Sequence, residues 1–403
     1  MPGAIFQLNL KGKQDIFLTG NPEINFIKQV YKRYINFASE VIRIAPNDIS
    51  NFGSKMTVEI PRKGDFLHKM SFAFGLPPLK VKSGTYVGWT NSIGHAMIDY
   101  VDLEIGGLLV DRNYGLYMEI WHELTVKPGT RSIDDAIIGK YDHMKSLQVN
   151  ANYPTSYTIP LKFWFCNNLG SAFPLLSLQY HSIKVIFNFR KFSECIVYDG
   201  DIPPDPVDIF APNIVGEYIY IDDIYREKYI GAGHKFLISQ IQHISGVSVG
   251  SGSVSRIHLP FNNPVSELLW ILRETESGLN NDWFNFSQRD VQLEKPVFPL
   301  MKEARLLLDG KERVEAQLQL IYNTLLIARY HTNITSKHIY ILPFCNEPEK
   351  WYPTGSLNFS RIQTAELIVE TFPNIKSSTI YVFAKNFNYL YVSEGMARLE
   401  FSV

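Results

Sequence analysis

FCNNLGSAFPLLSLQYHSI, at residues 165–183, is repeated at residues 344–362 as FCNEPEKWYPTGSLNFSRI. Seven identities lie at a constant step of 179 residues, whereas unrelated segments of this length share about one identity. The matched pairs are Phe165–Phe344, Cys166–Cys345, Asn167–Asn346, Pro174–Pro353, Ser177–Ser356, Leu178–Leu357 and Ile183–Ile362. The pattern indicates an internal duplication. We interpret the repeated residues as the structural signature of each copy, formed by a strand, its turn and the next strand.

Two weaker traces of the duplication precede this pair, and all three traces keep the same order. LEIGG at 103–107 matches LLLDG at 306–310 at a step of 203, and each is followed by a helical run. VEIP at 58–61 matches IHLP at 257–260 at a step of 199. The step falls from 203 to 179, so we expect a 24-residue loop insertion in the first copy, within the segment LTVKPGTRSIDDAIIGKYDHMK at 124–145.

The composition is typical of a globular protein with more than one core. A chain of 403 residues favours two domains of roughly 170 to 200 residues. The 13% aromatic content and 22 prolines favour many short strands joined by turns. A formal net charge of −1 lacks the basic character of proteins that neutralise many phosphates, so we expect no nucleic-acid partner.

The three cysteines form no C-x-x-C pattern, and we expect them to be buried free thiols. The amino-terminal residues lack the apolar run of a signal peptide. No uninterrupted apolar run reaches the ~18 residues needed to span a bilayer. These features predict synthesis in a reducing cytoplasm.

Apolar residues recur at every second position along many short segments, as in 56–60 and 70–74 on either side of a PRKGD turn. About eight such strands per half, with one short helix after the glycine turn, are typical of a jelly roll. The predicted fold class is all-β, with two tandem eight-stranded antiparallel jelly-roll β-sandwiches, short helices in loops and an N-terminal arm. The predicted divisions are 1–40 for the arm, 41–225 for the first jelly roll and 226–403 for the second.

A short amphipathic helix is predicted within the arm, at residues 21–34. Asn21 is a good N-cap and Pro22 suits the first helical position. The helix could pack on its own domain, or it could grip a neighbouring subunit or an underlying layer. The candidate assembly residues are Thr19, Gly20, Asn21, Pro22, Ile24, Ile27, Tyr31, Lys28, Lys32 and Arg33.

Patterns that could carry catalysis or bind a metal are weak. GVSVG at 246–250 fits G-x-S-x-G, but it continues as a turn and a strand where the nucleophile elbow needs a helix. The histidines form neither H-x-H nor H-E-x-x-H, so a cupin-like metal enzyme is disfavoured. His122, His331 and His338 are expected to be surface or packing residues. We therefore predict that the protein is not an enzyme and has no catalytic residue, cofactor or metal.

Two further sequence features allow other interpretations. The acidic loop DGDIPPDPVD at 199–208 could hold a hard cation, but it lacks the twelve-residue calcium-loop pattern. Trp283, Trp351 and Tyr352 lie in predicted loops and motivate an alternative from another functional class, a carbohydrate-binding jelly-roll protein. The sequons at Asn285, Asn333 and Asn358 are weak signals in a cytoplasmic chain.

The opening of the chain, GAIFQLNLKGKQDIFLTGNPEINFIKQVYKRYINFA at 3–38, closely resembles the amino terminus of a known family. It is similar to the major capsid proteins of nucleocytoplasmic large DNA viruses, particularly their algal and giant-virus branch. Their usual opening is QD-x-[YF]-LTGNP followed by an F-x-x-x-Y-[RK]-R helix. Four later segments look like family landmarks in family order: DLEIGG, the stretch 163–181, GSLNFSRI and FAKNFNYLYVSEGMA.

This resemblance implies a double jelly roll, three copies of which form a pseudo-hexagonal capsomer that tiles an icosahedral shell. The implied partners are two further copies in a homotrimer, neighbouring capsomers, minor capsid proteins and, indirectly, an internal membrane layer. The implied location is the virion capsid, assembled in the host cytoplasm. The LTGNP segment and its helix would face inward at the base of the capsomer.

Two departures from the family pattern favour a second interpretation within the same class. Lys11-Gly12-Lys13 stands where the family usually has tyrosine, glycine and alanine, and it adds two positive charges. The segments 290–304 and 343–354 are short for distal loops. A minor capsid paralogue at special shell positions is therefore the alternative to the major form.

Overall fold

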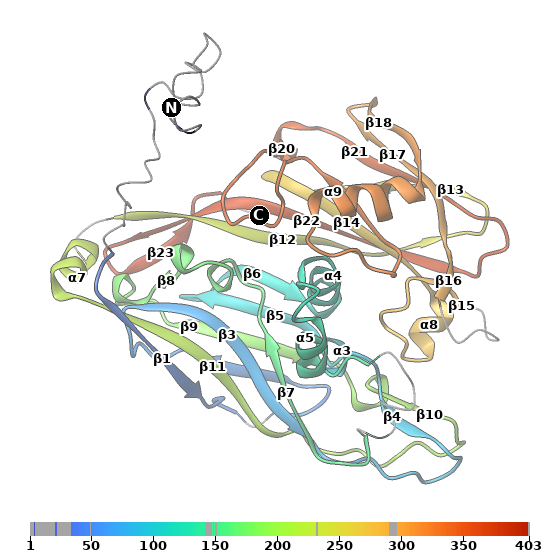
Figure 1. Ribbon diagram of the computed structural model, residues 1–403, viewed down its shortest axis with the longest axis horizontal. Coiled ribbons are helices and arrows are strands. Elements are labelled where there is room, and N and C mark those ends of the chain that lie inside the picture. The colour runs from blue at the N-terminus through green and yellow to red at the C-terminus, as the bar shows by residue number, and fades with distance from the viewer. Residues whose placement is uncertain are drawn as a thin grey trace. The chain divides into compact units, whose positions relative to one another are not determined.

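The computed structural model describes residues 34–48, 50–141, 151–230, 233–289 and 296–401, together with residues 4, 21, 147 and 149. Residues 37–403 form one compact unit, separate from residues 1–36. Within this unit the chain builds two β-sandwiches in succession, the first drawn in blue to green and the second in yellow to red (Figure 1).

The first sandwich consists of two four-stranded antiparallel sheets and a few short elements. One sheet has the order β1 (Phe37–Ile44), β11 (Phe210–Ile221), β3 (Phe66–Leu76) and β7 (Thr155–Pro160). The other has the order β2 (Lys55–Glu59), β9 (Ile183–Phe189), β5 (Ile98–Ile105) and β6 (Leu108–Tyr114). The short elements are β4 (Val87–Trp89) paired with β10 (Ile196–Tyr198), and β8 (Phe173–Pro174) paired with β3.

The second sandwich repeats this plan. One sheet has the order β12 (His234–Val249), β22 (Ser378–Ser393), β14 (Pro264–Glu274) and β19 (Ile339–Pro343). The other has the order β13 (Val254–His258), β21 (Ala365–Thr371), β17 (Met301–Leu308) and β18 (Lys311–Leu318). Its short strands are β15 (Ser287–Arg289), β16 (Pro296–Pro299), β20 (Leu357–Asn358) and β23 (Met396–Leu399).

The two sandwiches have the same topology. When the eight main strands of each half are numbered in chain order, both halves place strands 1, 8, 3 and 6 in one sheet and 2, 7, 4 and 5 in the other. This is the jelly-roll order, in which the first and last strands are neighbours. The predicted fold class, two tandem eight-stranded jelly rolls, is confirmed.

The alternating sequence pattern explains how each sandwich closes. In β9, IKVIFNF, the odd-numbered residues are buried and the even-numbered ones are half-buried. The inward side chains meet the opposite sheet, where the rings of Phe187 and Phe72 are centred 4.6 Å apart. Burial of an aromatic side chain of this size stabilises the fold by roughly 1.5–3 kcal/mol. A separate core of the same kind fills the second sandwich.

The hairpin turns explain why LEIGG at 103–107 matches LLLDG at 306–310. Gly106 and Gly107 connect β5 to β6 with φ of 58° and 82°, and Asp309 and Gly310 connect β17 to β18 with φ of 49° and 74°. Two consecutive residues with positive φ match the right-handed twist of the flanking strands, which is why such turns favour Gly-Gly and Asp-Gly. The second residue of each turn is the glycine conserved between the two copies at a step of 203.

The ladders align the later part of the repeat differently from the sequence identities. Pro160 ends β7 opposite Ser71, and Pro343 ends β19 opposite Glu267. The next residues, Leu161 and Phe344, donate their N–H to Met70 and Ser266 at 2.9 and 2.8 Å. These equivalent positions lie 183 residues apart, so the identities at a step of 179 lie four residues out of register with the strand ends.

Short helices occupy the connections. The first jelly roll has α3 (Ile93–Ala96), α4 (Gly115–Thr125), α5 (Arg131–Ile138) and the 3-10 turns η1 (Trp164–Cys166), η2 (Leu169–Ser171), η3 (Leu175–Ser177) and η4 (Phe192–Glu194). The second has α8 (Thr275–Leu279), the π-helical turn η5 (Ile321–Leu325), α9 (Leu326–Tyr330) and η6 (Phe359–Arg361). The segment between them contains α7 (Asp223–Ile230). None of the helices described is long and apolar enough to cross a bilayer.

Candidate functional site

The helix α4 joins the two jelly rolls. Its sequence, GLYMEIWHELT, is apolar on nearly every side, and all residues from Gly115 to Leu124 are buried. Its apolar side chains form a third core with the outer face of the second jelly roll. This core contains Leu116, Tyr117, Ile120, Trp121 and Leu124 from α4, and Leu269, Ile271, Phe284, Phe286, Ile327, Ile339, Ile341 and Phe383 from the second jelly roll. We call this contact the junction.

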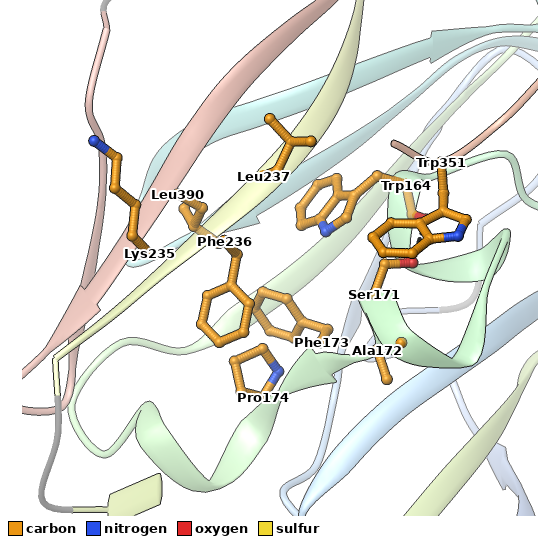
Figure 2. Close-up of a pocket in the computed structure, with 11 residues that line it drawn as sticks. Trp164, Ser171, Ala172, Phe173, Pro174, Lys235, Phe236, Leu237, Trp351 and Leu390 are labelled. Carbon is orange, nitrogen blue, oxygen red and sulfur yellow. Dashed lines mark hydrogen bonds between the residues drawn. The ribbon is translucent and has the colours of Figure 1, made fainter. Parts of the chain in front are cut away.

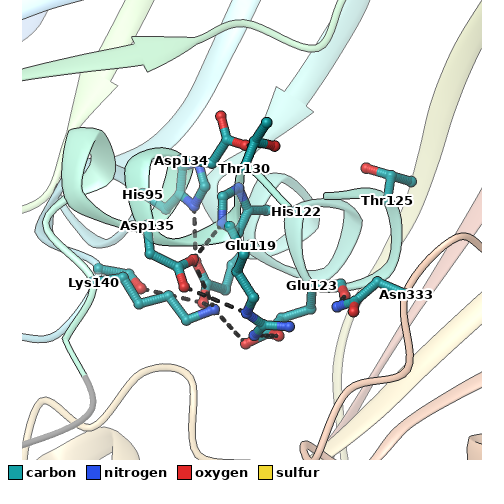
Figure 3. Close-up of polar contacts among 12 residues, drawn as sticks. His95, Glu119, His122, Glu123, Thr125, Thr130, Asp134, Asp135, Lys140 and Asn333 are labelled. Carbon is teal, nitrogen blue, oxygen red and sulfur yellow. Dashed lines mark hydrogen bonds and ion pairs between the residues drawn. The ribbon is translucent and has the colours of Figure 1, made fainter. Parts of the chain in front are cut away.

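A cluster of charged side chains is buried at the junction (Figure 3). Glu119 and Glu123 lie one turn apart on α4 and therefore face the same side. Glu119 accepts a hydrogen bond from His95 at 2.8 Å and lies 2.8 Å from the ammonium of Lys337. The ammonium of Lys140 lies 2.6 Å from the Glu123 carboxylate. Each carboxylate is thus held by a cation inside the protein.

The predicted loop insertion supplies the outer part of this cluster. The insertion contains α5, whose Arg131 donates to Glu123 at 2.7 Å. Asp135, one turn further along α5, lies 2.7 Å from Nε2 of His122 and 3.5 Å from the ammonium of Lys140. The strand registers, with steps of 203 at the hairpin turns and 183 at the ends of β7 and β19, correct the size of this insertion from 24 to 20 residues, and its helix α5 covers α4 with polar side chains.

The second jelly roll reaches α4 through three residues of one loop. Asn333 donates its side-chain N–H to the backbone carbonyl of Glu123 at 2.7 Å, and Thr335 donates to the Glu123 carboxylate at 3.1 Å. Lys337 lies within 3.2 Å of the same carboxylate as well as contacting Glu119. The end of α4 is therefore tied to the second jelly roll by hydrogen bonds and by charge.

The cations outweigh burial in setting the ionisation of the two glutamates. Burial alone would raise the pKa of Glu119, but Lys337, His95 and Lys140 hold it well below its usual value. Burial would likewise raise the pKa of Glu123, yet Lys337 and Lys140 lower it to about 2. Burial lowers the pKa of His95 to about 4, so its imidazole is neutral and donates through Nδ1. Three carboxylates, those of Glu119, Glu123 and Asp135, balance the cations of Arg131, Lys140 and Lys337.

A second set of charges flanks Trp121 of α4. Nε2 of His331 lies 2.7 Å from Glu267, and its Nδ1 lies 3.0 Å from Glu349. Burial lowers the pKa of His331, but the two carboxylates outweigh burial and raise it to about 9, so the ring is protonated. The ring of Trp121 contacts His331 edge to face, and the ammonium of Lys385 lies 4.3 Å from the Trp121 ring centroid. A first-jelly-roll tryptophan is thus held between two cations of the second.

This arrangement of paired charges suits a rigid contact between the two jelly rolls. Paired, hydrogen-bonded charges in a buried site specify one geometry, because any displacement leaves a charge without a partner. Among the residues that the structure describes, no group of three or more histidine, cysteine, aspartate or glutamate side chains is placed to hold a metal ion. The junction therefore sets the position of one jelly roll against the other.

A pocket of about 210 Å³ lies where the two copies of the signature stretch approach each other (Figure 2). The first copy contributes Phe173 and Pro174, and the second contributes the half-exposed Trp351. Phe236 of β12 lines the pocket beside Phe173 and Pro174 (Figure 2). Four aromatic side chains line the pocket, and Phe236 and Leu390 of the second jelly roll also pack with the core of the first.

The candidate residues from the sequence lie in several places. Of the assembly residues only Asn21 is described, with an exposed side chain and a φ of 50°, and the others lie outside the described residues. Phe165, Phe173, Pro174 and Leu178 are buried in the first jelly roll, and Cys166 is half-buried. Phe344, Cys345, Asn346, Pro353 and Leu357 follow β19 in the second. Their role as a repeat signature, like the domain bounds, stays a prediction.

Two of the histidines form buried contacts with carboxylates that the sequence did not predict. His122 and His331 are buried at the junction, where each pairs with a carboxylate. The sequence feature that could have indicated these contacts is EIWHEL, which places three polar residues in an otherwise apolar helix. Of the aromatic residues that motivated carbohydrate binding, Trp283 donates its indole N–H to the Glu194 carbonyl at 2.7 Å and stacks on Arg190. Only Trp351 and Tyr352 are exposed.

Comparison with protein families gives two adjoining matches that span most of the chain. Residues 25–226 match the family described as "Major capsid protein N-terminus". Residues 226–398 match the family described as "Large eukaryotic DNA virus major capsid protein".

Curated proteins with similar sequences are capsid proteins of large DNA viruses. The chain is 31% identical to the major capsid protein of Pyramimonas orientalis virus, and the alignment covers the whole of both chains. It is 27% identical to the major capsid protein of Paramecium bursaria Chlorella virus 1, again over the whole of both chains.

Solved structures show the same fold. A chain in a quasi-atomic model of the PBCV-1 virus capsid superposes with a TM-score of 0.82 at 22% identity, covering 94% of this chain and all of that one. The Faustovirus major capsid protein gives a TM-score of 0.73 at 13% identity, covering 95% of this chain and 94% of that one.

Proposed function

The chain belongs to the family of large eukaryotic DNA virus major capsid proteins, and on that premise we propose that it acts as a homotrimeric capsomer. It is a structural capsid protein of the virion. In the proposed assembly three copies place six jelly rolls in a pseudo-hexagonal ring, and rings tile an icosahedral shell assembled in the host cytoplasm. Minor capsid proteins and, indirectly, an internal membrane would contact these rings. The role requires no catalysis.

The observation that supports the proposed trimer is a difference in burial between two equivalent helical segments. In the first jelly roll α4 follows β6 and precedes β7, and in the second η5 and α9 follow β18 and precede β19 (Figure 1). The helix α4 is buried against the second jelly roll of its own chain. The equivalent η5–α9 segment has only Tyr322 and Ile327 buried.

Large apolar side chains are exposed around this second helical segment. Leu325 is 59% exposed, and Leu318, Leu320 and Ile334 are exposed to a similar extent. We call these four residues the α9 surface. Monomeric proteins rarely leave a cluster of large aliphatic side chains in water, and such clusters mark interaction sites. The α9 surface is therefore suited to contact another chain.

A matching sheet face is exposed on the first jelly roll. The outer face of the second jelly roll bears Leu269 and Ile271, which α4 covers. On the first jelly roll Phe37 and Val41 of β1 are 47% and 67% exposed. We call Phe37 and Val41 the β1 surface. It lies on the sheet that is equivalent to the one covered by α4 in the second jelly roll.

Each copy thus has a helical segment flanked by exposed aliphatic side chains and a sheet with exposed apolar side chains on its outer face. A contact between the α9 surface of one copy and the β1 surface of the next is heterologous, and such contacts close into a ring when the rotation permits. Three copies with two jelly rolls each would give six similar contacts, three within chains and three between them. Obligate interfaces of this kind bury more than about 2,000 Å².

Electron microscopy of the purified protein tests this proposal. Class averages should show a ring with six sandwich-sized densities and threefold symmetry. Separate particles with two such densities would contradict the trimer. The copy number of the chain in virions, measured against the other shell proteins, separates the major form from a minor capsid paralogue.

A further inference from the structure

A second pocket, of about 310 Å³, lies on the first jelly roll away from the junction. It is formed by the turn between β2 and β3, by the end of the signature stretch, and by residues of β11 and α7. Its lining combines cationic and aliphatic side chains. The lining residues used below are Arg62, Lys63, Asp65, Leu175, Leu176, Leu178, Tyr220 and Arg226. We call it the cationic pocket.

Two of its three cations have no carboxylate partner among the described residues. The guanidinium of Arg62 donates to the backbone carbonyls of Gln179 and His181 at 2.6 and 2.9 Å, and both acceptors are neutral. Lys63 is exposed and forms no ion pair with a described carboxylate. Arg226, in contrast, is paired with Asp65 at 2.9 Å and Asp223 at 2.8 Å. The charged residues that line the pocket are thus three cations and one carboxylate, and that carboxylate is paired with Arg226.

The orientation of Arg62 favours recognition of a planar anion. Two backbone carbonyls of the signature stretch hold its guanidinium, so little side-chain entropy remains to be lost when a ligand binds. Its remaining N–H groups form a rigid fork that matches a carboxylate. Lys63, the next residue, adds a flexible point charge beside this fork.

The rest of the lining is apolar. Leu175 and Leu178 are buried, and Leu176 is half-exposed. The half-exposed ring of Tyr220 forms another part of the lining, and its hydroxyl hydrogen-bonds to Glu40 at 3.2 Å. A ligand that fits this lining must combine a negative charge with an aliphatic group, which a small inorganic anion does not do.

We propose that the cationic pocket docks an acidic peptide segment of a partner protein. A glutamate or aspartate carboxylate of that segment would pair with Arg62 and Lys63, and a neighbouring aliphatic side chain would lie on Leu176. Charge complementarity of this kind steers association and selects the partner, and it weakens as salt screens the charges. The inference does not depend on the trimer.

Fluorescence anisotropy with the full chain tests the proposal. The probe is a fluorescein-labelled peptide that alternates leucine with glutamate. The chain should bind it at low salt, and Lys63→Glu should weaken binding by about tenfold or more because an attraction becomes a repulsion. Arg62→Gln should weaken binding to a similar extent. Lys311→Glu, an exposed site on β18, should leave it unchanged.

Other outcomes would overturn the proposal. Equal binding of a peptide with glutamine in place of glutamate would show that the pocket does not recognise the carboxylates. Equal loss in Lys63→Glu and Lys311→Glu would show a non-specific charge effect. Binding to phosphatidylglycerol vesicles without binding to the peptide would assign the pocket to an anionic lipid surface instead. Thermal unfolding of each variant checks that the fold is retained.

Discussion

The ammonium of Lys337, on the second jelly roll, lies 2.8 Å from the carboxylate of Glu119, on the helix α4 of the first. The Glu119 side chain is completely buried, so this charge pair crosses the junction inside the protein. An ion pair in such a site holds its partners to one geometry, because a displaced charge would lose its partner in a medium that solvates it poorly. The angle between the two jelly rolls, on which the proposed capsomer depends, is therefore set by the side chains of the junction.

Replacing Lys337 with methionine should destabilise the protein by about 3 kcal/mol, because one partner of a buried pair is removed and the carboxylates remain. The urea midpoint of unfolding measures the change. The double variant Lys337→Met, Glu119→Gln should recover part of the loss. Lys311→Met, at an exposed site, should change the midpoint little. An unchanged midpoint for Lys337→Met would contradict the role assigned to the junction.

Acid should weaken the junction. The folded-state pKa of Glu123 is about 2, below its ordinary value of 4.5, because the attraction of Lys337 and Lys140 outweighs burial. A lowered pKa contributes stability above pH 4.5, and this contribution disappears as the pH falls towards 2. Urea midpoints measured across this range should fall, and Glu123→Gln should fall less steeply. Parallel curves for the two proteins would show that Glu123 does not carry the acid sensitivity.

Raising the pH should weaken the ion pairs of His331, whereas lowering the pH should weaken those of Glu123. Burial opposes protonation of His331, but Glu267 and Glu349 raise its pKa from 6.5 to about 9. The raised pKa contributes stability that is complete below pH 6.5 and is lost as the pH rises through 9. Thermal unfolding between these values should show a decline that His331→Gln abolishes. If the variant declines as steeply as the unmodified protein, another group is responsible.

The α9 surface can be tested by placing a charge on it. Leu325→Asp puts a carboxylate into the proposed contact between copies, where it would be desolvated without a partner, so the trimer should dissociate to monomers. Size-exclusion chromatography with light scattering measures the mass. Leu279→Asp is the matched control, since Leu279 is also highly exposed but lies at the end of α8. Dissociation in both variants, or in neither, would argue against this interface.

The fold was accessible from the sequence because its signals are periodic and repeated. Alternation in segments such as IKVIFNF follows from one face of each strand meeting the core, and the Gly-Gly and Asp-Gly turns follow from positive φ at both positions. The alignment of the two copies residue by residue was harder to predict from the sequence. Identical residues at a step of 179 lie in connections, where the chain tolerates insertions, whereas the ladders align Pro160 with Pro343.

The junction could not be derived from local pattern. Glu119 and Glu123 stand out in an apolar helix, but their partners Lys140 and Lys337 lie 17 and 214 residues after Glu123, and no spacing rule connects them. Whether a buried glutamate is neutral or charged depends on these distant cations. The cationic pocket was hidden for the same reason, since Arg62 and Gln179 meet only in the folded chain.

Sedimentation velocity of the purified chain at micromolar concentration tests the central claim most directly. The claim is that the contact between α4 and the second jelly roll is repeated between copies by the α9 and β1 surfaces. The predicted result is one species with three times the 46.2 kDa mass of the chain. A single species at the mass of one chain, stable across the concentration range, would contradict it.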